Sequence, residues 1–142
     1  MEENVNVLDE LNKGATMGMD AINFLIKKVE DEDFKMVLLE EYFDYKAVSD
    51  KANMLYKKYS NDKIHETNMM NKMMTMSMVN MSTIKDKTNS KIAEMLMQGT
   101  NMGIIEGRRL LNHKKVDRKV RKLLNAFVAI QEKNVEVLKD YL

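Results

Sequence analysis

Four acidic residues are the side chains of this sequence whose type best suits a metal ion: Asp20, Glu41, Asp44 and Glu106. Carboxylates are hard oxygen ligands, and a di-iron site in a helical bundle takes a glutamate from each of two helices and a Glu-x-x-His pair from each of the other two. Here Glu41 is followed at the third position by Asp44 and not by histidine. The carboxylates therefore predict a degenerate half site, with iron binding as the alternative. The simpler interpretation of Glu41 is a core carboxylate that hydrogen-bonds Tyr45 or another neighbour, because an unpartnered buried charge is costly.

A run of methionines is the second chemically distinctive feature, and its members are Met69, Met70, Met73, Met74, Met76, Met78 and Met81. Thioethers are soft ligands that suit monovalent copper or silver. Methionine also favours helices and packs well on irregular surfaces, and these residues would occupy all faces of a helix. We therefore predict packing or self-association through this segment, with a protein partner or a soft metal as the alternatives.

The sequence offers few residues suited to covalent catalysis. It contains no cysteine, and its two histidines, His65 and His113, lie in different segments, so no nucleophile-histidine-acid arrangement is defensible from spacing. The net charge is +1, and residues 108–122 form a local basic stretch with eight lysines and arginines against one acid. Without interleaved aromatic residues or a recognition helix, this stretch predicts a solvated turn, or a contact for the acidic turn 30–33 of another subunit, and nucleic acid is an unlikely partner.

The composition predicts a folded, cytoplasmic protein. Apolar residues make up 44% of the 142 residues and charged residues 32%, which is enough for one core with a soluble surface. The first residues lack the pattern of a signal peptide, and no apolar run approaches the roughly 20 residues that span a bilayer. We therefore expect one domain over 1–142, with no disulfide and no membrane span.

Helical periodicity dominates the first part of the chain and predicts an all-α fold. Apolar residues recur at steps of three and four over 4–29 and 34–59, which is the spacing of a buried helical stripe. The acidic turn 30–33 is short, so the two segments should form an antiparallel hairpin over 4–59. The predicted inward residues are Leu8, Leu11, Ala15, Gly18, Ile22, Leu25, Val29, Phe34, Leu38, Glu41, Tyr45, Val48, Ala52, Leu55 and Tyr59.

The second part of the chain predicts a similar hairpin over 89–142. Between the hairpins, residues 63–85 should form a methionine-rich connecting helix of about 30 Å, long enough to cross from one end of the bundle to the other. The sequence leaves open whether the helix crosses in this way or lies as an arm beside an up-down-up-down bundle. The predicted inward residues of the second hairpin are Ile92, Leu96, Gly103, Leu110, Val116, Val120, Leu123, Phe127, Ile130, Val137 and Tyr141.

The two hairpins align with each other without a gap when the chain is shifted by 85 residues. Nine positions are then identical, and they include four of the five glycines, which occur in two copies of Gly-x-x-Met-Gly. We interpret this as an internal duplication. Each interior helical glycine costs about 1 kcal/mol relative to alanine, so packing must require its small size. The glycines predict that the first and third helices cross closely at Gly14, Gly18, Gly99 and Gly103.

Three phrases, at 17–22, 29–34 and 92–105, are similar to small ferritin-like four-helix-bundle proteins of anaerobic Gram-positive bacteria. The resemblance covers nearly the whole chain. It implies a ferritin-like four-helix bundle made of two repeated hairpins, and it implies no particular activity.

These observations together predict a non-enzymatic protein of structural or adaptor-like role. It should self-associate, as a dimer, and carry a degenerate ferritin-like metal site without a resident cofactor. The alternative is a metal-handling protein that binds iron through bundle carboxylates, or copper or silver through the methionine-rich helix.

Overall fold

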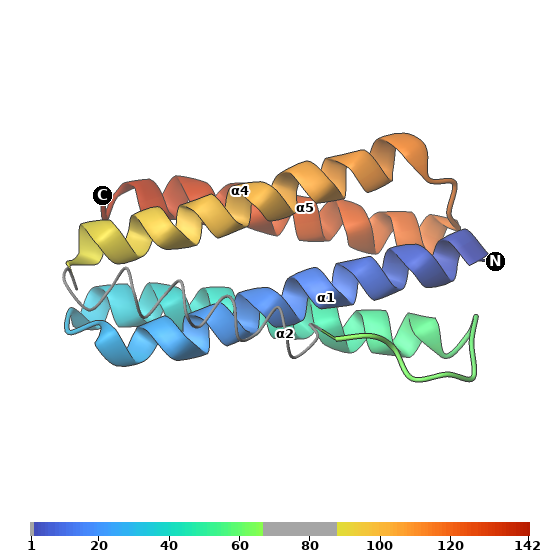
Figure 1. Cartoon of the computed structure of the whole chain (residues 1–142), viewed down its shortest axis with the longest axis horizontal. Helices are drawn as coiled ribbons and strands as arrows, with labels where there is room; N and C mark the ends of the chain where they lie inside the picture. Colours follow the sequence, from blue (N-terminus) through green and yellow to red (C-terminus); the bar gives the residue numbers. More distant parts are fainter. Residues whose placement is uncertain (1, 67–87) are drawn as a thin grey trace.

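A computed structural model describes residues 2–66 and 88–142, and every regular element in these two ranges is helical (Figure 1). The predicted all-α class is confirmed. The elements, in chain order, are α1 (Glu2–Leu25), a short 3-10 helix η1 (Ile26–Lys28), α2 (Glu32–Tyr56), α4 (Asn89–His113) and α5 (Arg118–Lys139). None of the described helices is long and apolar enough to cross a membrane.

The helix starts follow from local side-chain chemistry. Asp31 lies at the N-cap of α2, where its carboxylate accepts a hydrogen bond of 3.0 Å from the backbone N–H of Phe34. Thr88 occupies the same position before α4, and its hydroxyl accepts a bond of 3.2 Å from the N–H of Lys91. Such caps satisfy backbone donors that the first turn leaves without a partner.

Contacts at the two ends of the bundle fix the direction of each helix. The start of α1 meets the turn between α4 and α5, because the side chain of Asn4 accepts a bond of 2.8 Å from the N–H of Asp117. At the other end, the amide of Asn89 donates to Asp31 at 3.3 Å. Thus α1 and α2 are antiparallel, α4 and α5 are antiparallel, and α2 and α4 run in the same direction (Figure 1). An up-down-up-down bundle is excluded.

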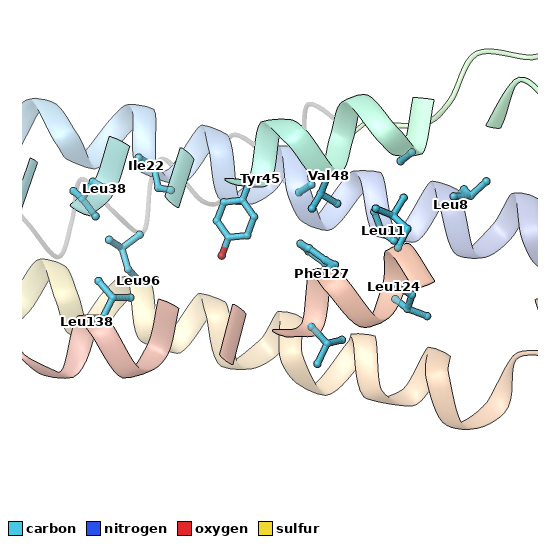
Figure 2. Packing of buried hydrophobic residues seen from close by; sticks show 14 of the residues in the cluster. Leu8, Leu11, Ile22, Leu38, Tyr45, Val48, Leu96, Leu124, Phe127 and Leu138 are labelled. Atoms are coloured by element: carbon cyan, nitrogen blue, oxygen red, sulfur yellow. The ribbon is translucent and has the colours of Figure 1, made fainter. Parts of the chain in front are cut away.

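The predicted stripes form most of the core. Ile22 of α1 lies near Leu38 of α2 toward one end of the core, where the second pair contributes Leu96 and Leu138 (Figure 2). Leu8 and Leu11 of α1 lie toward the other end, where the second pair contributes Leu124. At the end of the bundle, the rings of Phe34 and Tyr141 stack with centroids 4.4 Å apart. Each hairpin thus buries one apolar stripe against the other.

Several predicted inward positions are wrong by one residue. Tyr56 is buried near the end of α2, while Leu55 and Tyr59 are only partly buried. In α5, Gln131 and Asn134 are buried, while Ile130 is only partly buried. The periodicity of 3.6 residues fixes a face only to within one residue, and the contacts between helices decide which neighbour is buried.

Only residues 63–66 of the predicted connecting helix are described, and they are not helical. Two side chains of α1 hold this segment instead. Asp9 accepts a bond of 2.9 Å from the backbone N–H of His65, and the amide of Asn12 donates to the His65 carbonyl at 2.8 Å. These polar groups of α1 bind the backbone of a segment that is irregular where the sequence predicted a helix. The seven methionines from Met69 to Met81 lie outside the described residues.

Candidate functional site

A group of buried polar side chains lies at the middle of the bundle and is contributed by three helices. We call it the central polar layer, and it consists of Glu41 and Tyr45 of α2, Thr100 of α4, and Gln131 and Asn134 of α5. Buried side chains of this kind normally have hydrogen-bond partners, since an unpartnered polar group costs free energy. The central polar layer is therefore the first candidate functional site.

Tyr45 organises the layer. Its ring extends from α2 into the space between the two hairpins, beside Phe127 (Figure 2). The two rings meet edge to face, with centroids 6.1 Å apart. On the other side, Gly18 leaves room for Tyr45, because a Cβ at Gly18 would lie 2.7 Å from the ring. Burial raises the pKa of Tyr45, while the nearby side chains of Asn134 and Thr100 oppose this effect.

Gln131 occupies an equivalent space in the second hairpin. A Cβ at Gly103 would lie 2.7 Å from its Oε1 and 2.8 Å from its Nε2, so only glycine leaves room for this amide. Within the part of the chain that the structure describes, Gln131 Oε1 has no hydrogen-bond partner. The same holds for Glu41 Oε2, while the side chain of Asn134 lies close to Tyr45. These orphaned atoms make the layer a polar site with unused hydrogen-bonding capacity.

Glu41 is the one acidic member of the layer. Its pKa is raised from 4.5 to about 8, mainly because burial removes the carboxylate from water and secondly because Asp44 is close; Lys133 opposes this. Lys133 also forms an ion pair with Asp44 at 3.4 Å. Near pH 7 the Glu41 carboxyl is therefore neutral in the folded protein. A neutral carboxyl donates and accepts hydrogen bonds, as its amide neighbours do.

The four carboxylates predicted as metal ligands are not gathered into a metal site. Across residues 2–66 and 88–142, no three histidine, aspartate or glutamate side chains form a group that could hold a metal ion. Glu106 lies on the surface of α4, 3.8 Å from Arg109. Asp20 is half-buried on α1, and Asp44 pairs with a lysine. The described residues do not fit a di-iron centre, since its ligands must be deprotonated and must converge.

Three of the four predicted crossing glycines lie beside large side chains of α2 and α5. A Cβ at Gly14 would lie 3.1 Å from the Phe127 ring. Similarly, the closest atoms to a Cβ at Gly18 belong to Tyr45, and those to a Cβ at Gly103 belong to Gln131. Nothing described lies within 4 Å of a Cβ at Gly99. The close crossing of the first and third helices at these glycines stays a prediction. Three glycines leave space for large side chains of α2 and α5.

Sequence reasoning missed the amides of α5, although one signal was present. Gln131 and Asn134 interrupt the apolar stripe of α5 at positions that face inward. A polar residue in a stripe is a candidate for a buried hydrogen-bonded group. A second example is Asn12, whose side-chain oxygen accepts a bond of 2.6 Å from the Ser49 hydroxyl in the core.

The outer surface of α2 is the second candidate functional region. Four large apolar side chains on this helix are exposed to solvent: Met36 (59%), Leu39 (40%), Phe43 (60%) and Met54 (69%). We call them the outer α2 row. Single exposed apolar residues need no explanation, but several on one face of a helix indicate an interaction surface.

Comparison with protein-family models, with curated proteins and with solved structures found no match.

Proposed function

We propose that this chain is a non-enzymatic helical-bundle protein, structural or adaptor-like, that self-associates and retains a degenerate form of a ferritin-like metal site. The order of helix directions supports the ferritin-like interpretation, because two antiparallel pairs in which the second and third helices run in the same direction need a long crossover between them. In such a bundle, carboxylates at the middle would hold the metal. In this chain, the central polar layer contains neutral amides and a neutral carboxyl at that position.

The proposed duplication also has support. A shift of 85 residues places α1 on α4 and α2 on α5, with their starts matching to within a few residues. Gly18 and Gly103 are equivalent under this shift, and each leaves space for a side chain of the second helix in its own hairpin. Two copies of one hairpin that pack in the same way explain why both keep a costly helical glycine.

The outer α2 row is the observation that carries the proposed self-association. Its members lie on the face of α2 opposite the core, and each keeps 40% or more of its surface exposed. Burying such side chains against another surface stabilises an assembly by about 25 cal/mol for each Å² removed from water. A helix that is apolar on two opposite faces is typical of a protein that binds another one.

Light scattering of the purified protein, coupled to size exclusion, tests the proposal. The chain has a mass of 16.6 kDa, so a dimer has twice this mass, about 33 kDa. We expect the dimer mass from low to high micromolar concentration. A monomer mass over this whole range would contradict self-association.

Metal handling is the alternative function. The protein purified from medium supplemented with iron and copper should contain no stoichiometric metal under our proposal. Stoichiometric iron that is lost in Glu41→Ala would support metal handling instead. So would copper that is lost when Met73, Met74 and Met76 are replaced by leucine, in the segment outside the described residues.

A further inference from the structure

Helix α2 has a regular outer face as well as a buried one. An α-helix completes a turn in about 3.6 residues, so the 18 residues from Met36 to Met54 are about five turns and place the two side chains on one line. Phe43 is about two turns from Met36 and joins the same line, with Ala47 one turn further. Tyr45, two residues from Phe43, lies on the opposite face and is 5% exposed, against 60% for Phe43.

Charge divides α2 and its flanking residues into two halves. Apart from the buried Glu41, residues 30–44 contain six acidic residues and one lysine, whereas residues 45–58 contain four lysines and one aspartate. A parallel copy of the helix would place acid against acid and base against base. An antiparallel copy would place each acidic half against a basic half. Opposite charges across an interface select the partner and its orientation.

The apolar and the charged pattern give the same register. In an antiparallel pair with its two-fold axis at the level of Tyr45, Met36 faces Met54 of the partner subunit and Phe43 faces Ala47 of the partner subunit. Glu40 and Lys51 are about three turns apart on α2, so both lie on the same side of the outer α2 row. In the antiparallel pair, Glu40 of one subunit therefore lies close to Lys51 of the partner subunit. Among the described residues, neither has an ion-pair partner in its own bundle.

We propose that the outer face of α2, from Met36 to Met54, docks against α2 of a second copy of this chain, with the two helices antiparallel about a two-fold axis level with Tyr45. This inference rests on the proposed self-association and names its surface and geometry. The interface is isologous, so each residue pair occurs twice. A second copy is favoured over an unrelated partner because the helix is complementary to itself in both charge and apolar spacing.

Cysteine cross-linking tests the geometry cleanly, because the chain has no cysteine of its own. Met36 and Met54 are exposed, so replacement of either by cysteine leaves the core intact. The positions are about 27 Å apart along one helix at about 1.5 Å per residue, far beyond the roughly 4.4–6.8 Å between Cα atoms that a disulfide requires. In the double variant, Met36→Cys with Met54→Cys, an intrachain disulfide is therefore impossible on folded α2.

We expect mild oxidation to convert the double variant to a covalent dimer, while each single variant stays unlinked. Single variants that cross-link by themselves would indicate a parallel or different pairing and overturn the inference. A wild-type dimer whose double variant does not cross-link would overturn this geometry and leave the proposed self-association standing. A monomeric wild-type chain in light scattering would overturn both.

A charge exchange on the surface gives an independent measurement. Glu40→Lys should weaken dimerisation about tenfold, because it replaces two attractive pairs by two repulsive ones. Adding Lys51→Glu to this variant should restore the wild-type dissociation constant, measured by analytical ultracentrifugation. Circular dichroism checks that both variants keep the wild-type helix content. Equal dimerisation of all three proteins would overturn the proposed register.

Discussion

Glu41→Gln is expected to stabilise the protein, by an amount that increases with pH. The variant keeps the shape of the side chain and its hydrogen-bonding groups but removes the titratable proton. Glu41 lies in the central polar layer with 4% of its surface exposed, and burial raises its pKa from 4.5 to about 8. Glutamine avoids the free energy needed to keep this carboxyl neutral or to ionise it inside the bundle.

The pKa values set both the direction and the size of the effect. Between pH 4.5 and about 8 the folded protein holds the Glu41 proton and the unfolded chain has lost it. The folded state therefore binds more protons, and the free energy of unfolding decreases as pH rises through this window. The loss in the free energy of unfolding that Glu41 causes through its raised pKa is about 5 kcal/mol above pH 8, about 3 kcal/mol at pH 7 and less than about 1 kcal/mol near pH 5.

Urea unfolding followed by circular dichroism at about pH 5, 7 and 9 measures this effect. The gain in the free energy of unfolding for Glu41→Gln should grow by about 4 kcal/mol from the lowest to the highest pH. Glu136→Gln is the control, because Glu136 is an exposed residue of α5 outside the proposed interface, and its stability should stay within about 0.5 kcal/mol of wild type. A gain that is the same at every pH, or no gain at pH 9, would refute the reasoning that Glu41 is neutral in the fold.

Three further substitutions test contacts of Gly18 and Asp9 in the first hairpin and the open space beside Gly99 in the second. Gly18→Ala should lower the free energy of unfolding by about 1–3 kcal/mol, because the new Cβ would lie 2.7 Å from the Tyr45 ring. Gly99→Ala should raise it by about 1 kcal/mol, since nothing described lies within 4 Å; equal effects in urea unfolding would contradict this difference. Asp9→Ala removes the acceptor of the His65 backbone N–H and imidazole, each at 2.9 Å, and should cost about 2 kcal/mol. It should also speed proteolysis of the segment that follows α2, and an unchanged cleavage rate would show that this anchor is unimportant.

Local chemistry made the helices predictable. The stripes at steps of three and four identified all four described helices, and the acidic turn before Phe34 marked the start of α2 because Asp31 is a good N-cap. The central position of Glu41 was also evident, since it interrupts an apolar stripe on its buried side. These features depend on residues within a few turns of one another, which a sequence displays directly.

The partners of the inward residues could not be derived in this way. Periodicity shows which face of a helix is buried, but not which helix covers it. For this reason the amides of Gln131 and Asn134 were missed, and so were the side chains that lie beside Gly14, Gly18 and Gly103. The raised pKa of Glu41 likewise depends on burial by all the surrounding helices together.

The sequence by itself determined the all-α class, the two hairpins and the stripe that each helix buries, because these follow from the geometry of a single helix. Only the tertiary structure decided that α2 and α4 run in the same direction and that Tyr45 and Gln131 fill the space beside two glycines. Such features arise from contacts between residues far apart in the chain, and the spacing of residues along one helix carries no information about them.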